Sequence, residues 1–398
     1  MKFQYMKKKV KFISILILFL FDINYSLKKY FYKNKLFSFC VNNNLKIKRL
    51  EELFKYKLKN NTILIFEPNR HHYECTPGFA KFFIDLGYNI DIIMNTFGKD
   101  ALCLFEPIEK IELFIYENLS QIFNNSAKLN LIINKYKYTL IQTTDKSKKI
   151  LYEKLGLFKM NNTIFVLHNI NYVNYLGISN LYNKKRILSL GNFGKALQVN
   201  PHYFGKIRLK PKNYKTRFFM TSNFYRNYNH LLSAIERLKK DNLKFEIIVI
   251  GWGKSFSYKK IPKNIKNYFT FKYRVSYSKL YKYVDSSDYI IIILDKNNKK
   301  DLAYSRNKAT GSIQLAYGFS KPVLINEHFA KIYDINSDNS FIYDNNNFYD
   351  IMQKAISLKN IEYKRKQNNL IKLSKKIYKF SLNNLKHSLK TIMKKKYK

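Results

Sequence analysis

The sequence predicts an α/β protein with two Rossmann-like, doubly wound domains. One reason is length, because 398 residues suffice for two domains that each have their own core. Another is the alternation of short apolar runs with helical patterns along most of the chain. A third is the break at residues 199–213, which contain two prolines and a glycine and show little periodicity.

The first series of elements starts at 62–66 (TILIF), a β-branched run typical of a buried parallel strand. A polar loop and a helical pattern through Phe79, Phe82 and Leu86 follow it, and Gly87 is expected to end this helix. The other elements expected in the first domain are strands at 90–94, 139–143, 163–167 and 186–190 and a helical pattern at 111–123.

The second series starts after the break and has the same rhythm. Its expected strands are 217–221, 245–253, 289–294 and 322–325. Helices are expected at 227–240 and 277–284, and a further helix is expected to begin within 305–319. There, two cations and a Thr-Gly-Ser triplet stand directly before an apolar run. Two such series favour two doubly wound domains over one.

The expected boundaries divide the chain into four parts. Residues 1–60 form a basic, aromatic N-terminal extension, 61–205 the first domain, 206–355 the second domain, and 356–398 a basic helical tail. Residues 1–60 contain 15 Lys and Arg against 3 acidic residues, and an apolar run at 12–21 follows several lysines. This pattern leaves three alternatives open, which are a membrane-surface anchor, a cleaved signal and a packed hydrophobic element.

The formal net charge of +46 points to an anionic partner. Lys, Asn, Ile, Tyr and Phe are abundant whereas Gly and Pro are scarce, so biased base composition also raises the lysine count. We therefore expect an anionic membrane surface as the partner and no nucleic acid, although a nucleic-acid-binding protein remains an alternative. The three cysteines form no CxxC pair, which is typical of a reducing compartment and gives no metal or disulfide framework.

Three loops at predicted strand ends of the second half carry residues suited to holding a phosphate. Loops of this kind lead into helix N-termini, whose free N–H groups and dipole favour an anion. The candidates are Ser222, Asn223 and Arg226 in the first loop, Gly251, Gly253 and Lys254 in the second, and Arg306, Lys308, Thr310, Gly311 and Ser312 in the third. Taken alone, Thr310 or Ser312 could equally be a helix cap.

In the first half, His71, His72, Glu74 and Cys75 follow the first predicted strand, and His168 follows the strand at 163–167. His72, Glu74 and His168 are candidate catalytic residues, because His and Glu at strand ends serve in acid and base chemistry. A plain polar loop and a metal site are the alternatives, but adjacent loop residues rarely wrap one ion. The chain has no Asp-x-Asp pair, so we expect no metal and no other cofactor.

The second half resembles the nucleotide-sugar domain of GT-B-fold glycosyltransferases of the large group-1, family-4-like set. The resemblance runs from FFMTSNFYRNYNHLLSAIERL through FEIIVIGWG to SIQLAYGFSKPVLI, and PGFAKFFIDLGYNIDIIM is similar to the opening of that set's acceptor domain. It covers about 61–355, with Leu315 in place of an expected glutamate and Ser320 in place of an expected glycine.

The resemblance implies two domains that face each other across a cleft, and a glycosyltransferase that takes a sugar from a nucleotide-diphosphate sugar in that cleft. The acceptor would be a glycan or a lipid-linked molecule in bacterial surface polysaccharide synthesis, and the enzyme would be cytoplasmic and peripherally attached to the inner face of the membrane. The resemblance assigns the diphosphate contacts to Arg226, Lys308 and Thr310–Ser312. Because Leu315 replaces a carboxylate, a non-catalytic protein of the same fold remains an alternative.

Overall fold

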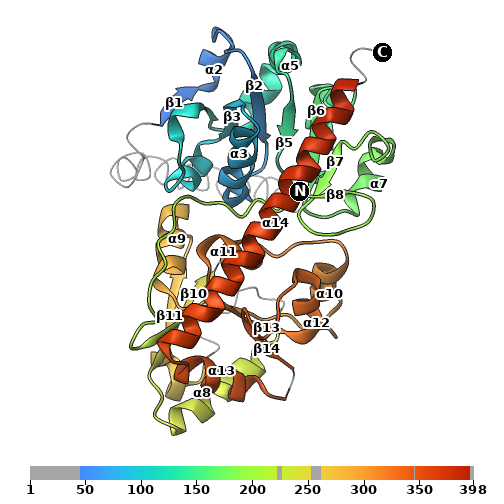
Figure 1. The fold of residues 1–398 in the computed structure, drawn as a ribbon. Coiled ribbons are helices and arrows are strands. Elements are labelled where there is room, and N and C mark those ends of the chain that lie inside the picture. The colour runs from blue at the N-terminus through green and yellow to red at the C-terminus, as the bar shows by residue number, and fades with distance from the viewer. Residues whose placement is uncertain (1–44, 222–225, 252–260, 345, 395–398) are drawn as a thin grey trace, which may run out of the picture. The chain divides into compact units, whose positions relative to one another are not determined.

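The computed structural model describes residues 45–221, 226–251, 261–344 and 346–394 (Figure 1). The apolar run at 12–21 and four candidate site residues, Ser222, Asn223, Gly253 and Lys254, lie outside the described residues. Among the described helices, none combines the length and the apolar character that crossing a membrane requires.

The first sheet has eight parallel strands in the order β1-β4-β3-β2-β5-β6-β7-β8. The strands are β1 (Lys46–Arg49), β2 (Thr62–Glu67), β3 (Asn89–Asn95), β4 (Ile111–Tyr116), β5 (Thr139–Ile141), β6 (Thr163–Leu167), β7 (Ile187–Ser189) and β8 (Leu197–Gln198). The strand order reverses direction between β2 and β5. Ligands of open α/β sheets bind at such a switch point, beyond the carboxyl ends of the strands.

The second sheet has six parallel strands in the order β11-β10-β9-β12-β13-β14. The strands are β9 (Thr216–Thr221), β10 (Phe245–Gly251), β11 (Phe269–Tyr273), β12 (Tyr289–Ile292), β13 (Val323–Asn326) and β14 (Phe341–Tyr343). Numbered within the domain this order is 3-2-1-4-5-6, the order of dinucleotide-binding sheets. The predicted class, two Rossmann-like doubly wound domains, is confirmed.

Helices connect the parallel strands, as Figure 1 shows. The α-helices of the first domain are α2 (Leu50–Leu53), α3 (Thr76–Asp85), α4 (Leu119–Asn124), α5 (Ser126–Lys135), α6 (Lys149–Lys154) and α7 (Tyr172–Leu176). Those that follow are α8 (Asn229–Lys240), α9 (Tyr277–Ser286), α10 (Lys299–Arg306), α11 (Gly311–Phe319), α12 (Glu327–Ala330), α13 (Phe348–Ser357) and α14 (Asn360–Lys394). Pro77 stands in the first turn of α3, where its missing N–H costs nothing, and Gly87 with φ +86° follows the helix end.

One expected element is wrong. The pattern at 111–123 predicts a helix, but β4 pairs with β3 and β1, and only then does α4 begin. The boundary is set by Asn118, whose side chain accepts a hydrogen bond from the N–H of Gln121 while the Gln121 side chain reaches back. A short apolar run is compatible with a helix or a strand, and here pairing with two neighbouring strands makes the segment a strand.

Helix α14 packs against both domains (Figure 1). Near its start, Gln367 Nε2 donates a hydrogen bond to the carbonyl of Ser320 at 3.4 Å. Near its end, Asn384 Nδ2 donates to the carbonyl of Gln198 at 2.8 Å, and Leu385 and Leu389 are buried in the first domain's core. The expected basic tail is therefore a helix whose apolar side contributes to the fold.

Residues 46–53, which fall within the expected N-terminal extension, are part of the first sheet and its cover. β1 pairs with β4, and Leu50 and Leu53 of α2 are 0% and 2% exposed. Removing residues 1–58 should therefore lower the melting temperature well below that of a chain lacking only 1–44. Each buried leucine lost costs about 2–5 kcal/mol. Equal melting temperatures for the two truncated chains would contradict this placement.

Candidate functional site

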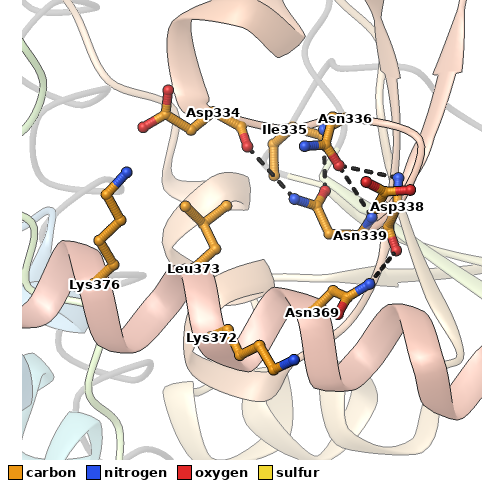
Figure 2. A pocket seen from close by; sticks show the side chains of 9 residues that line it. All are labelled: Asp334, Ile335, Asn336, Asp338, Asn339, Asn369, Lys372, Leu373 and Lys376. Atoms are coloured by element: carbon orange, nitrogen blue, oxygen red, sulfur yellow. Dashed lines mark hydrogen bonds between the residues drawn. The ribbon is translucent and has the colours of Figure 1, made fainter.

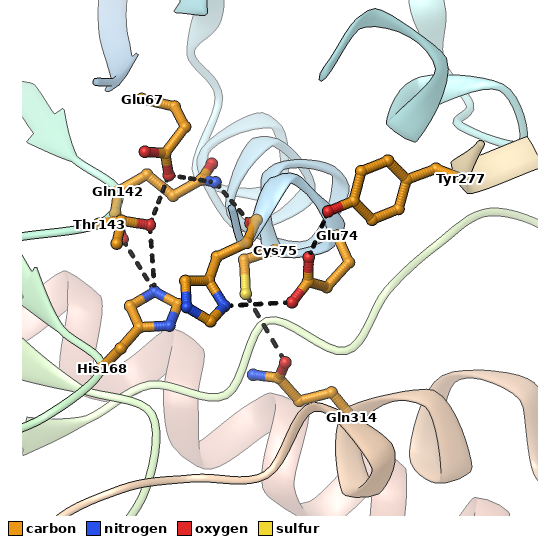
Figure 3. A network of polar contacts seen from close by, with 9 residues as sticks. Glu67, Glu74, Cys75, Gln142, Thr143, His168, Tyr277 and Gln314 are labelled. Atoms are coloured by element: carbon orange, nitrogen blue, oxygen red, sulfur yellow. Dashed lines mark hydrogen bonds and ion pairs between the residues drawn. The ribbon is translucent and has the colours of Figure 1, made fainter. Parts of the chain in front are cut away.

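Polar side chains meet at the switch point of the first sheet (Figure 3). Glu67 is the last residue of β2 and is fully buried. Its Oε2 accepts hydrogen bonds from Thr143 Oγ1 at 2.5 Å and from Gln142 Nε2 at 2.9 Å, both just after β5. His168, just after β6, lies beside them, with its Nε2 3.4 Å from Thr143 Oγ1. Three neighbouring strand ends thus form one polar group.

The loop after β2 brings two further candidates to the same place. The His72 ring lies against the His168 ring, with centroids 4.1 Å apart and the ring planes tilted by 38°, and His72 Nδ1 lies 3.3 Å from Glu74 Oε1. The other carboxylate oxygen, Glu74 Oε2, accepts a hydrogen bond from the Tyr277 hydroxyl at 3.0 Å. Tyr277 begins α9 of the second domain. The three side chains expected to be catalytic therefore lie together, although their catalytic role stays a prediction.

The environment keeps these groups in proton-accepting forms. Burial, together with the neighbouring His72, lowers the pKa of His168 well below its ordinary value, so the ring is neutral at neutral pH. For Glu74, burial raises the pKa, but the hydrogen bonds and the charge of His72 outweigh it, and the pKa is lowered overall. The neutral imidazole of His168 and the carboxylate of Glu74, which both contact His72, are each suited to taking a proton from a hydroxyl.

The start of α11 lies next to this group. Thr310 is the N-cap residue, yet its side chain makes no capping hydrogen bond, so the helix-cap alternative for its hydroxyl is not supported. A Cβ added at Gly311 would lie 3.7 Å from Glu74 Oε1. Ser312 Oγ is 3.1 Å from Thr221 Oγ1 at the end of β9. The first turn of α11 therefore sits between the end of β9 and the first-domain carboxylate.

Lys308 lies in the same contact region. Its backbone forms an antiparallel bridge with Asn169, the residue after His168, and Ile170 N donates to the Asn307 carbonyl at 3.0 Å. The Lys308 side chain is partly exposed. Lys308 and the α11 start are thus held beside the His72, Glu74 and His168 group.

Two other predicted cations, Arg226 and Arg306, are joined to α10, the helix that precedes Lys308. Arg226 is buried, with its Nε 3.8 Å from Asp301 Oδ1 and its guanidinium 5.9 Å from the Tyr304 ring centroid. Arg306 is exposed in the last turn of α10, before the α11 loop. Gly251 ends β10 and is buried. The contacts of Arg226 join it to α10, and those of Lys308 join it to the loop after β6.

Sequence reasoning missed five members of the site, which are Glu67, Gln142, Thr143, Tyr277 and Gln314. Cys75 Sγ donates a hydrogen bond to Gln314 Oε1 at 3.6 Å, and Gln314 Nε2 is buried without a partner among the described residues (Figure 3). The neighbouring Leu315, which the resemblance noted above aligns with a glutamate, is buried in the apolar core of the second domain. A carboxylate ending a strand at the switch point was the available signal for Glu67.

A separate pocket of about 480 Å³ lies between α14 and the segment 334–339 (Figure 2). Its lining residues are Asp334, Ile335, Asn336, Asp338, Asn339, Asn369, Lys372, Leu373 and Lys376. Asn336 Oδ1 accepts the backbone N–H groups of Asp338 and Asn339, and Asn369 Nδ2 donates to the Asp338 carbonyl at 3.1 Å. These bonds fix the segment against α14, and no candidate residue lines the pocket. In the described part of the chain, no three His, Cys, Asp or Glu side chains are placed to hold a metal ion.

The fold matches solved glycosyltransferase structures. A glycosyltransferase from Rickettsia africae matches with a TM-score of 0.53 and 15% identity over 85% of this chain and 100% of that chain. An alpha-glucosyltransferase in complex with UDP and a 13-mer DNA matches with a TM-score of 0.53 and 11% identity, over 83% of this chain and 99% of that chain. A variant of TarM from S. aureus was solved in complex with fondaparinux, alpha-GlcNAc-glycerol and UDP. It matches with a TM-score of 0.52 and 11% identity, over 81% of this chain and 99% of that chain.

No known protein-family profile matches the sequence, and none of the curated proteins compared with it matches either. At these identities the structural likeness establishes architecture. The strand orders of both sheets and the contacts of α14 with both domains agree with this two-domain architecture. The chain has the GT-B fold of glycosyltransferases.

Proposed function

We propose that the protein is a glycosyltransferase that uses a nucleotide-diphosphate sugar. One observation carries the proposal, namely that the α11 start and Lys308 lie directly beside His72, Glu74 and His168. Free N–H groups and a cation suit a diphosphate, and the paired imidazole and carboxylate suit a hydroxyl acceptor. The presence of UDP in the alpha-glucosyltransferase and TarM structures supports this class of substrate.

In the proposed reaction, an acceptor hydroxyl attacks the anomeric carbon of the sugar. The new C–O bond forms as the bond to the diphosphate oxygen breaks, and the hydroxyl proton passes to Glu74 or His168. The leaving nucleotide diphosphate gains negative charge, which Lys308 and the N–H groups of α11 stabilise. The chain's own cationic and amide groups thus supply the charge stabilisation, and no metal is part of the proposal.

Turnover of labelled nucleotide sugars tests the proposal most directly. A thermal-shift panel of nucleotide sugars first identifies the substrate, since a ligand at 100 times its Kd should add about 2.7 kcal/mol of stability. Transfer of label from that nucleotide sugar to a glycan or lipid-linked acceptor should follow. Binding without any transfer would support the alternative of a non-catalytic GT-B protein, which Leu315 motivates.

We further propose a lipid-linked acceptor at an anionic membrane surface, in bacterial surface polysaccharide synthesis. The outward side of α14 supports this, because its exposed cations recur at helical spacing beside exposed Ile361 and Phe380. The exposed cations are Lys364, Arg365, Lys372, Lys375, Lys376, Lys379, Lys386 and Lys390. Exposed apolar side chains on the same face favour a lipid interface over nucleic acid.

Replacing Lys375, Lys379 and Lys386 by glutamine should weaken binding to phosphatidylserine-containing vesicles about a hundredfold, because each cation near such a surface contributes about 1 kcal/mol. Cosedimentation at low salt measures it. The matched control replaces three exposed lysines of the first domain, Lys55, Lys57 and Lys110, and should change binding less. Equal vesicle binding by the wild type, the α14 variant and the control variant would contradict the role of α14. Binding to duplex DNA without binding to vesicles would favour a nucleic-acid partner.

A further inference from the structure

Glu67 is a buried acid whose role the proposed reaction leaves open. It is 0% exposed, and no ion pair to it occurs among the described residues. Its carboxyl accepts three hydrogen bonds, from Asn69 N at 2.7 Å, from Gln142 Nε2 and from Thr143 Oγ1. A buried acid that receives this many bonds orients the groups that donate them.

The Thr143 hydroxyl is fixed by its bond to Glu67. Thr143 Oγ1 donates its one hydrogen to Glu67 Oε2 at 2.5 Å. Burial raises the pKa of Glu67 well above its ordinary value, and this bond from Thr143 acts in the opposite direction by favouring the carboxylate. The remaining lone pairs of Thr143 Oγ1 therefore face outward, toward His168 Nε2 at 3.4 Å. A second acceptor, the Gln142 carbonyl, lies 3.3 Å from the same nitrogen.

These two acceptors decide which nitrogen of His168 carries the proton. A carbonyl oxygen only accepts, and a hydroxyl already donating to Glu67 also only accepts. His168 Nε2 must therefore carry the hydrogen, and in the neutral ring Nδ1 keeps a free lone pair. The groups facing this ring are His72, which lies against it, and Glu67 beyond the Thr143 hydroxyl.

The other bond to Glu67 reaches the second histidine. Gln142 Nε2 donates to Glu67 Oε2 and also to the backbone carbonyl of His72 at 3.0 Å (Figure 3). His72 has a left-handed backbone with φ 69°, which a residue with a side chain rarely adopts without support. Gln142 thus holds His72 in the conformation that places its ring against His168 and brings its Nδ1 to Glu74.

We propose that Glu67 is a positioning residue that, through Thr143 and Gln142, sets the tautomer of His168 and the conformation of His72. In this arrangement Nδ1 of His168 is the atom that takes the acceptor proton, and Glu67 itself exchanges none. The proposal rests on the proposed function for the use of His168, but the tautomer is a property of the free protein. The sequence separations are 76 residues between Glu67 and Thr143 and 25 between Thr143 and His168, so the device exists only in the folded sheet.

Nitrogen-15 NMR of histidine-labelled full-length protein tests the tautomer, with His168→Asn to assign the signal. The wild type should show Nε2 protonated and Nδ1 unprotonated at neutral pH. Thr143→Val removes one of the two acceptors at Nε2 and leaves the Gln142 carbonyl, so it should raise the population of the other tautomer. Thr143→Ser should restore the wild-type spectrum. Glu67→Gln should act like Thr143→Val, and Thr143→Val keeps the test decisive where Glu67→Gln does not fold. A wild type with Nδ1 protonated, or an unchanged tautomer in Thr143→Val, overturns the proposal.

Transfer kinetics supply a second readout. Thr143→Val should lower kcat about tenfold to a hundredfold with an unchanged KM for the nucleotide sugar, and Thr143→Ser should recover most of it. A loss of melting temperature without this split between kcat and KM would indicate a structural role and overturn the proposal. Absence of transfer in the wild type would instead contradict the proposed function, while the NMR result would still decide the tautomer.

Discussion

Replacing Glu74 by glutamine should lower kcat by about 10²–10⁴-fold with little change in the affinity for the nucleotide sugar. The carboxylate lies between His72 Nδ1 at 3.3 Å and the Tyr277 hydroxyl at 3.0 Å, so its orientation is fixed from both domains. An amide of the same shape keeps the Tyr277 bond but loses the negative charge beside His72, which would stabilise a proton taken up by the adjoining His168. Stopped-time transfer assays and nucleotide-sugar titrations give the two quantities separately.

Glu109→Gln is the matched control, because Glu109 is an exposed acid of the same domain. It should leave both kcat and affinity unchanged. His72→Ala is expected to fall in the same range as Glu74→Gln, since the His72 ring contacts both Glu74 and His168. Near-wild-type turnover in Glu74→Gln and His72→Ala would remove this loop from the mechanism.

The loss of kcat/KM at acidic pH should be governed by the surroundings of His168. Burial and the nearby His72 place the pKa of His168 in the folded protein well below its ordinary value. A base with a lowered pKa stays unprotonated until the pH falls through that value, so kcat/KM should persist below pH ~6.5 and be lost only in more acidic solution. A half-maximal kcat/KM at or above pH ~6.5 would exclude His168 as the base.

The main strands could be predicted because they are continuously apolar and buried on both faces. β2, β6 and β13 are examples, and every residue of each is buried. β1 could not be predicted in this way, because it is a short edge strand, KIKR, with exposed or half-buried side chains. Its apolar content is too low for a strand pattern, and pairing with β4 decides its structure.

Part of the site could be predicted from position alone. His72, Glu74 and His168 all follow strands, and parallel strands place their carboxyl ends at one edge of the sheet. The hydrogen-bond partners of these residues could not be predicted, because the identity of the partners depends on the strand order and on the second domain. Gln142 lies 75 residues from Glu67, and Tyr277 lies 203 residues from Glu74. Nothing local marks such pairs.

Sequence alone does not give the different surroundings of Arg226 and Lys308, the two cations expected to contact a diphosphate. Arg226 and Lys308 both look suited to an anion, but Arg226 is buried against Asp301 of α10. Lys308 is instead partly exposed beside the loop after β6. The difference arises from α10, an additional helix between β12 and α11, whose Asp301 provides a partner for Arg226.

Lys308→Ala should lower kcat/KM by about 100-fold or more, the scale of losing one group that stabilises transition-state charge. As the glycosidic bond breaks, negative charge grows on the leaving diphosphate, so a cation at the α11 start stabilises the transition state more than the bound substrate. Lys299→Ala, at an exposed lysine of the neighbouring α10, is the control and should leave kcat/KM unchanged. Activity should survive EDTA, and a strict requirement for Mn²⁺ or Mg²⁺ would contradict charge stabilisation by the chain alone.

Gly311→Val should be at least as damaging as Lys308→Ala, for a steric reason. The nearest atom to a Cβ at Gly311 is Glu74 Oε1 at 3.7 Å, an ordinary contact, so a Cβ fits at this position without a clash. The added methyl groups would occupy the space between the first turn of α11 and Glu74, where a diphosphate must approach the N–H groups closely. The melting temperature should therefore stay near that of the wild type while nucleotide-sugar binding is lost. Normal binding in Gly311→Val, or unchanged kinetics in Lys308→Ala, would mean that this turn only begins a helix.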